Sequence, residues 1–182
     1  MRPKEETPPF PVPDASLEPR FRAVLDAHGG VLWRIAGAYA RTRPDREDLY
    51  QEMLLQVWRA LPSFRGEAAE RTWLTRIAFN VALGAARRAD VRRTVDAPTA
   101  IDAAAGEARP DLDAERGDAA ARLHAALAGL AEVDRALVLM TLDARSHAEM
   151  ADVLGLSVSN VGVRLHRAKK ALAARLSDPL PS

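Results

Sequence analysis

Residues 64–80, FRGEAAERTWLTRIAFN, place aromatic and basic side chains together at helical spacing. Aromatic rings can stack on unpaired bases, and arginine and asparagine can donate hydrogen bonds to phosphates and base edges. One side of the expected helix is apolar: Leu74, Ile77, Ala78, Val81 and Ala85. The other side carries Thr72, Arg76, Phe79, Asn80, Leu83 and Arg87, with Trp73 at its edge. This second side predicts contact with a single nucleic-acid strand. The alternative is that Trp73 and Phe79 pack against a neighbouring helix, which for Trp73 alone is the favoured interpretation.

Residues 146–172, SHAEMADVLGLSVSNVGVRLHRAKKAL, have the spacing of a short helix, a glycine turn and a second helix. Ser146 and Glu149 are spaced as a capping box, Gly155 suits a left-handed turn, and Ser157 can cap the second helix. On that helix we expect a core face of Val158, Val161, Leu165 and Ala168 and a polar face of Asn160, Arg164, Arg167 and Lys170. This pattern predicts a helix-turn-helix whose second helix enters the major groove. The alternative is a helical hairpin with a solvated basic face. For His166, a phosphate contact and a plain surface position are equally supported.

Catalysis has little support in the sequence. Asp48 and Glu52 are four residues apart, as two metal ligands on one helix face could be, but no second cluster accompanies them. The four histidines lack a metal-ligand spacing, no glycine-rich phosphate loop occurs, and the chain contains no cysteine. We therefore expect no enzymatic activity, no metal and no cofactor.

The elements that position these residues are expected to be helices. Apolar residues recur at helical spacing in the first third of the chain, with breaks expected at 28–30 (HGG) and 41–45 (RTRPD). Asp45 is expected to cap the helix that follows it, and the helix with the aromatic and basic residues should end near Arg88. Strand alternation and repeats are absent from the sequence. The predicted fold class is all-α, with two small helical domains joined by a flexible linker.

The charge pattern divides the chain further. Eight arginines face three acids in residues 59–93, six acids face one arginine in 94–115, and 157–177 carry five basic residues and no acid, although the net charge is only +1. Two basic zones flanking an acidic strip favour a nucleic-acid partner. The expected segments are a disordered N-terminal arm (1–15), a first helical domain (16–90), an acidic linker (91–116), a second domain containing the helix-turn-helix (117–177) and a tail (178–182).

The start of the chain is charged and proline-rich, and no long apolar run follows. Neither a signal peptide nor a membrane span is therefore expected, and we predict a soluble cytoplasmic protein. The helix after Asp45 should also have two faces. Leu49, Met53, Val57 and Ala60 point one way, and Asp48, Gln51, Glu52, Leu55 and Arg59 point the other. An exposed leucine within a polar rim suits a protein partner, although single exposed leucines are common.

Residues 45–88, DREDLYQEMLLQVWRALPSFRGEAAERTWLTRIAFNVALGAARR, resemble region two of a bacterial RNA polymerase sigma factor of the extracytoplasmic-function (ECF) type. The second domain resembles region four of the same family, in the same order and at the expected distance, so the resemblance covers about residues 17–176. It implies a transcription initiation factor that binds core RNA polymerase, recognises the minus-ten and minus-thirty-five promoter elements and assists promoter melting. It also implies an anti-sigma factor as a partner and no membrane insertion.

The resemblance assigns residues to three sites. The β′ clamp helices of core polymerase would contact Asp48, Gln51, Glu52 and Leu55. The minus-ten element would contact Phe64, Arg65, Gly66, Trp73, Arg76, Asn80 and Arg87, with residues 64–66 capturing a flipped base. The minus-thirty-five element would contact Ser159, Asn160, Arg164, His166, Arg167, Lys169 and Lys170, while the opposite face of that domain meets the β flap.

Several positions depart from the family pattern: Phe79, Gly162, the turn TLDARSH (141–147), which replaces a more regular glycine-containing turn, and Ala131, where proline is common. Phe79 stands where the family usually has arginine, which favours stacking or packing over a phosphate contact. Gly162 replaces a polar or basic residue and costs about 1 kcal/mol of helix propensity.

Two other functions are weighed against this one. A helix-turn-helix regulator acting without core polymerase would leave the aromatic and basic face of the first domain unused. An adaptor with protein contacts alone would show no salt-dependent DNA binding. We also hypothesise that the two lobes of the free protein close on each other, or on an inhibitor, until core polymerase separates them.

Overall fold

The computed structural model describes residues 17–95 and 114–177, in which helices are joined by short turns. The described elements are α1 (Leu17–Tyr39), α2 (Arg43–Ala60), the 3-10 helix η1 (Leu61–Ser63), α3 (Glu70–Val95), α4 (Ala114–Ala128), α5 (Glu132–Leu142), α6 (His147–Leu154) and α7 (Val158–Ser177). This part of the chain contains no strand, which confirms the all-α prediction. The predicted arm, the predicted tail and linker residues 96–113 lie outside it.

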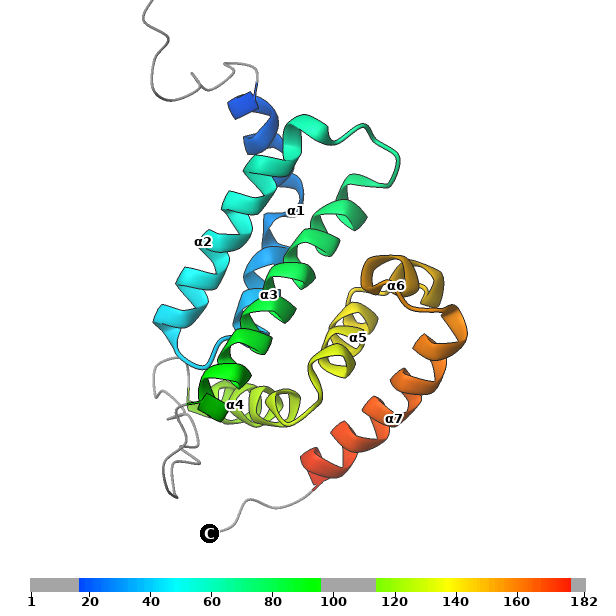
Figure 1. Ribbon diagram of the computed structural model, residues 1–182. Coiled ribbons are helices and arrows are strands. Elements are labelled where there is room, and N and C mark those ends of the chain that lie inside the picture. The colour runs from blue at the N-terminus through cyan, green and yellow to red at the C-terminus, as the bar shows by residue number, and fades with distance from the viewer. Residues whose placement is uncertain (1–16, 96–113, 178–182) are drawn as a thin grey trace, which may run out of the picture.

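Helices α1, α2 and α3 lie side by side and form the first lobe (Figure 1). Their apolar faces meet in a core that includes Leu32 from α1, Met53 and Val57 from α2, and Leu74 and Ala78 from α3, all fully buried. The core faces expected for α2 and α3 are largely correct, although Ala60, Ile77 and Ala85 are only half-buried.

Helix α1 does not break at residues 28–30. Gly29 and Gly30 continue the helix, although each costs about 1 kcal/mol of helix propensity relative to alanine. Val24, Val31 and Ile35, on either side of the glycines, are all buried within one helix. Packing of that apolar stripe outweighs the local propensity, which is why the expected break is wrong.

Helix α2 begins before the expected cap. Thr42 is the N-cap: its hydroxyl accepts from the Asp45 backbone N–H at 3.2 Å, and its own N–H donates to the Asp45 carboxylate at 3.1 Å. Pro44 occupies the first turn, where its missing N–H removes no helical hydrogen bond. Asp45 therefore completes a capping box and does not start the helix.

Helix α3 continues to Val95, past the expected end near Arg88. Residues 89–95 contain neither glycine nor proline, so nothing in them stops the helix. Helix α4 likewise begins at Ala114. Helical backbone thus extends into both edges of the segment expected to be a linker.

Helices α4 to α7 form the second lobe, and its local signals behave as expected with one exception. Ser146 and Glu149 form a capping box, Gly155 adopts the left-handed conformation with φ of 66°, and the Asn160 N–H donates to Ser157 Oγ at 3.2 Å. Val158 is 51% exposed, so its assignment to the core face is wrong. It lies about 60° round the helix from the buried Val161, at the edge of the apolar stripe.

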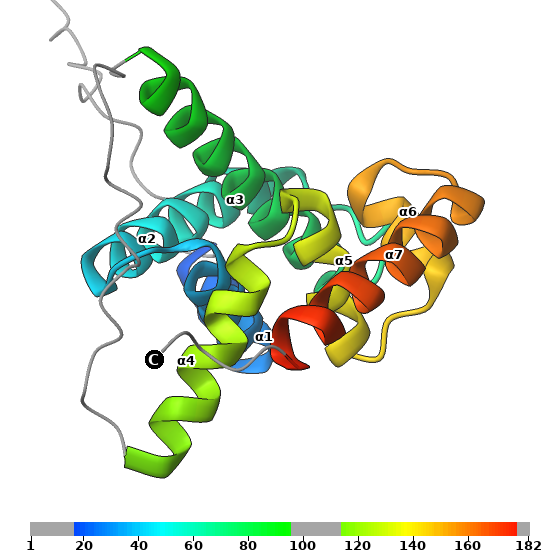
Figure 2. The ribbon, with the colours of Figure 1, turned by 90° about the horizontal axis from the view of Figure 1, so that it is seen from below.

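The two lobes pack directly on each other. Helices α5 and α6 contact α3, and α4 contacts α1, while α7 lies outermost against α4, α5 and α6 (Figures 1 and 2). Most buried apolar residues of both lobes belong to one cluster. None of the described helices is long and apolar enough to cross a membrane.

Gly155 and Gly162 should respond oppositely to alanine. Because φ is positive at Gly155, Gly155→Ala should lower the free energy of unfolding by about 1 kcal/mol. A Cβ at Gly162 would meet only the His147 ring, at 3.9 Å, so Gly162→Ala should raise that free energy by about 0.5–1 kcal/mol. Denaturant unfolding followed by circular dichroism measures both, and the reverse signs would contradict the assignment.

Candidate nucleic-acid interface

The loop between η1 and α3 carries an aromatic pair. The ring of Phe64 stacks on Trp73 with centroids 4.6 Å apart and planes inclined by 26°. Arg20 of α1 places its guanidinium 5.8 Å from the Phe64 ring centroid and donates to the Phe64 carbonyl at 3.0 Å. Gly66 has φ of 79°, a conformation that favours glycine. The fold thus brings together Phe64 and Trp73, with Arg65 and Gly66 exposed beside them.

The basic and aromatic side of α3 is divided between solvent and the second lobe. Asn80 and Arg87 are exposed, whereas Thr72, Phe79 and Leu83 are buried. The Phe79 ring lies edge-on to Tyr39, with centroids 6.4 Å apart. Of the two roles considered for Phe79, packing is therefore the one found here.

A small apolar cavity of about 50 Å³ adjoins Phe79. Leu139 and Met140 of α5 line it from the second lobe, and Val31 and Ile35 of α1 line it from the first. Phe79 therefore lies at the boundary between the lobes, which explains why it is only 1% exposed.

A groove of about 330 Å³ between α2 and α3 joins two of the predicted sites. Its lining is Glu52, Gln56, Ala60, Ile77, Asn80, Val81 and Arg88. Arg88 donates to both oxygens of the Glu52 carboxylate, at 3.1 and 3.2 Å. Glu52, assigned to polymerase, thus lies beside Asn80, assigned to the minus-ten strand.

The outer side of α2 carries the other residues assigned to core polymerase. Asp48 and Gln51 are exposed, and Leu55 is 46% exposed within that polar surface. The two faces expected for this helix are therefore present.

Helix α7 presents most of its predicted contacts to solvent. Exposed are Ser159, Asn160, His166, Arg167, Lys169 and Lys170. Arg164 differs, because its guanidinium pairs with the Asp134 carboxylate of α5 at 2.8 Å and is half-buried. In this state Arg164 contributes to packing within the lobe. Val163, for which the sequence predicted no contact, is exposed among the polar residues.

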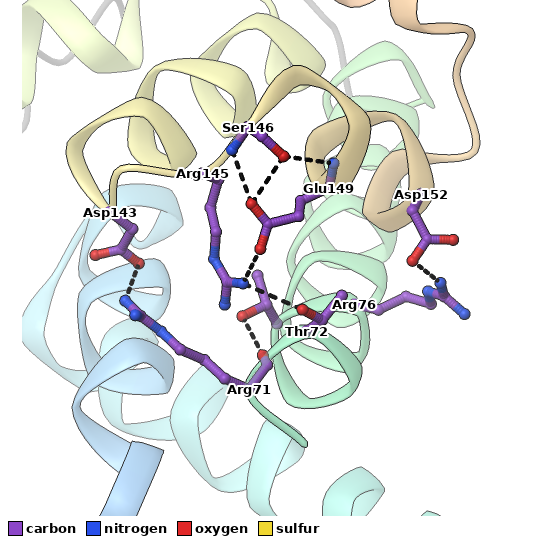
Figure 3. Close-up of polar contacts among 9 residues, drawn as sticks. Arg71, Thr72, Arg76, Asp143, Arg145, Ser146, Glu149 and Asp152 are labelled. Atoms are coloured by element: carbon purple, nitrogen blue, oxygen red, sulfur yellow. Dashed lines mark hydrogen bonds and ion pairs between the residues drawn. The ribbon is translucent and has the colours of Figure 1, made fainter. Parts of the chain in front are cut away.

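Carboxylates of the second lobe hold arginines of the first (Figure 3). Asp152 of α6 pairs with Arg76 of α3 at 2.6 Å. Asp143, just after α5, pairs with Arg34 of α1 at 2.7 Å and with Arg71 of α3 at 3.7 Å. Arg76, one of the residues assigned to the minus-ten element, is thus occupied by a carboxylate.

Arg145 completes this group, which we call the seam. Its guanidinium donates to the Thr72 hydroxyl of α3 at 3.1 Å and to Glu149 at 2.8 Å. Hydrogen bonds from the Ser146 N–H and from Arg145 lower the pKa of Glu149 to about 2, so this carboxylate is ionised at neutral pH. The seam is defined by Arg34, Arg71, Thr72, Arg76, Asp143, Arg145 and Asp152.

The sequence-based predictions did not include the seam partners. Asp143, Arg145 and Asp152 look like ordinary polar residues around a turn and a short helix. Their partners in the first lobe lie far away in the sequence, 73 positions in the case of Arg145 and Thr72, so no short-range spacing links them. Both lobes contain more basic than acidic residues, so their charge balance did not reveal these pairs either.

The described surfaces are suited to binding. Across residues 17–95 and 114–177, no group of three or more histidine or acidic side chains gathers as metal ligands would. What is arranged instead is a loop with stacked rings, a polar groove and a basic outer helix. These features match the recognition of nucleic acid and protein.

Comparison with known proteins agrees with this geometry. The Sigma-70 region 2 family model matches residues 24–92, and the Sigma-70, region 4 model matches residues 120–172. The ECF RNA polymerase sigma factor SigL of Mycobacterium tuberculosis is 33% identical over 163 residues, which cover 87% of this chain and 89% of that relative. SigM of the same organism is 31% identical over 156 residues, covering 86% of this chain and 76% of SigM.

Solved structures share the fold. CnrH, in complex with the cytosolic domain of CnrY, aligns with a TM-score of 0.64 and 27% identity over 87% of this chain and 88% of CnrH. RpoE of Bartonella quintana, in complex with the anti-sigma factor NepR, aligns with a TM-score of 0.64 and 20% identity over 91% of this chain and 100% of RpoE. Both sigma-70 regions are found in this chain, and the similarity to SigL covers most of both proteins. The chain therefore belongs to the ECF RNA polymerase sigma factors, transcription initiation factors that bind core RNA polymerase.

Proposed function

We propose that this sigma factor places its two lobes on different promoter elements. The loop at Phe64 and the exposed side of α3 hold the melted minus-ten strand, and α7 reads the minus-thirty-five element as duplex. The outer face of α2 docks on the β′ clamp helices, and the second lobe also meets the β flap. The single observation that supports this assignment is the presence of a stacked aromatic pair on one lobe and an acid-free basic helix on the other.

The same proposal covers location and partners. The protein acts in the cytoplasm and makes or breaks no covalent bond. An anti-sigma factor is proposed as its inhibitor, because RpoE of Bartonella quintana, which shares this fold, has been solved with the anti-sigma factor NepR.

The direct experiment is run-off transcription with purified core polymerase and a promoter library. We expect specific transcripts only when the protein is present, and mapping of their start sites yields both promoter elements. DNA binding without core polymerase, combined with no specific transcript when core is added, would favour the helix-turn-helix regulator instead.

Trp73→Ala and Arg167→Ala should impair different steps. Losing a stacking platform should reduce open-complex formation about tenfold, and a template with a pre-opened bubble should restore it because melting is then unnecessary. Arg167→Ala should weaken recognition of the upstream element, and the bubble should not rescue it. Permanganate reactivity of melted thymines measures the first step, and footprinting of the upstream element measures the second. Equal defects and equal rescue would contradict this division.

The seam supports a closed resting state for the free protein. Arg76 can neutralise either Asp152 or a strand phosphate, and Phe79 and Thr72 are covered by the second lobe. Core polymerase must therefore separate the lobes before α3 can hold DNA. Exposed ion pairs are typically worth only about 0.2–1 kcal/mol each, so polymerase binding can outweigh them.

Removing two seam carboxylates should open the protein. Asp143→Asn with Asp152→Asn should lower energy transfer between dyes placed at Arg59→Cys and Ala173→Cys, which label selectively because the chain has no cysteine. The apparent affinity for core polymerase should rise about two- to tenfold, because less free energy is then needed to separate the lobes before binding.

The matched control is Asp26→Asn with Glu67→Gln, which changes the net charge equally at exposed positions outside the seam. It should leave both the energy transfer and the affinity unchanged. If control and seam variants behave alike, the effect comes from net charge and the closed-state proposal fails.

A further inference from the structure

Val163 lies on the outer side of α7 and is 52% exposed. The buried stripe of this helix consists of Val161, Leu165 and Ala168, which face the rest of the lobe. At 100° per residue, Val163 is about 200° round the helix from Val161. Its side chain therefore points away from the core, on the surface that α7 offers to a partner.

The residues one helical turn from Val163 are all polar and exposed: Ser159, Asn160, His166 and Arg167. Lys169 and Lys170 follow, and the whole of α7 contains no acidic residue. Val163 is thus a single apolar side chain at the centre of a positively charged, hydrogen-bonding surface.

This setting favours DNA over a protein partner. A protein interface is expected to have several apolar residues at its centre, whereas here one valine is surrounded by hydrogen-bonding and basic groups. The major groove offers isolated apolar groups of matching size, the C5-methyl groups of thymine, between base-edge acceptors and phosphates. A β-branched valine also weakens an exposed helix slightly, so the residue has no evident role in stability.

We infer that Val163 contacts the C5-methyl group of a thymine in the upstream promoter element and selects T·A pairs at one or two positions there. The inference rests on the proposed function of α7 and adds a specificity-determining residue to it. Asn160 and Arg167, one turn before and after Val163, lie where they can donate to the neighbouring base edges or phosphates.

The test removes the methyl group from the DNA and the side chain from the protein. Holoenzyme is titrated against duplexes carrying the mapped upstream element, in which each thymine is replaced singly by deoxyuridine. Wild-type affinity should fall about fourfold at one or two positions, the effect expected for one buried methyl group. Val163→Ala should bind the all-thymine duplex about fourfold more weakly and show no further loss at those positions.

Val158→Ala is the matched control, because Val158 is 51% exposed on the same helix but lies about 140° round it from Val163. It should keep the methyl sensitivity at the positions that Val163→Ala abolishes. A purely structural role for Val163 would weaken binding to every duplex alike.

Several results would overturn the inference. The inference fails if the losses of affinity caused by deoxyuridine and by Val163→Ala are additive. It also fails if the upstream element contains no thymine or no methyl-sensitive position. A third contrary result is a transcription defect of Val163→Ala that is the same on every promoter, as the loss of a polymerase contact would give. Transcription by the wild-type protein in the same reactions distinguishes a failure of the proposed function from a failure of the role of Val163. Without specific transcripts the proposed function fails as well, whereas active holoenzyme without a methyl effect overturns only the role of Val163.

Discussion

The guanidinium of Arg135 ties the ends of two helices from different lobes to the start of α5. It donates to the carbonyls of Leu127 and Ala128 at the end of α4, at 2.9 and 2.7 Å, and to the carbonyl of Ala38 at the end of α1, at 3.1 Å. Carbonyls at helix ends have no partner within the helix, and the forked donors of arginine can serve several of them together. The rest of the second lobe takes its position from this junction.

Tyr39 completes the junction. Its ring lies 4.9 Å from the Arg135 guanidinium, and its hydroxyl donates to the Glu132 carbonyl at 2.6 Å. Burial raises the pKa of Tyr39, so the hydroxyl remains a donor. With the start of α5 fixed, Asp134 reaches Arg164 from one end of the helix, and Asp143 reaches Arg34 from the other. The ion pair that holds α7 and the ion pair that links the two lobes therefore both depend on the position of α5.

The sequence was sufficient where the physics is local. Capping at Ser146 and the turn at Gly155 depend on residues within one or two helical turns, and both were predictable, as were the apolar stripes apart from Val158. Together with the order of two motifs, these signals predicted the all-α fold and the family.

The larger errors concern packing between distant segments, whereas the cap at Thr42 and the end of α3 are local features that were misplaced. Gly29 and Gly30 remain helical because flanking residues are buried by other helices, and Arg164 is occupied because Asp134 is brought to it by the fold. The burial of Phe79 depends on a lobe that begins more than thirty residues later in the chain. Such effects follow from tertiary contacts, which single-sequence periodicity does not encode.

The stack of Phe64 on Trp73 has a consequence for selectivity. In this state the ring platform is already filled by a side chain of the protein, held from behind by Arg20. Any base that uses Trp73 has to displace Phe64, so its net gain is the difference between two stacking energies. This internal competition lowers the affinity for every strand. A base gains free energy at Trp73 only if it stacks there more strongly than Phe64 does.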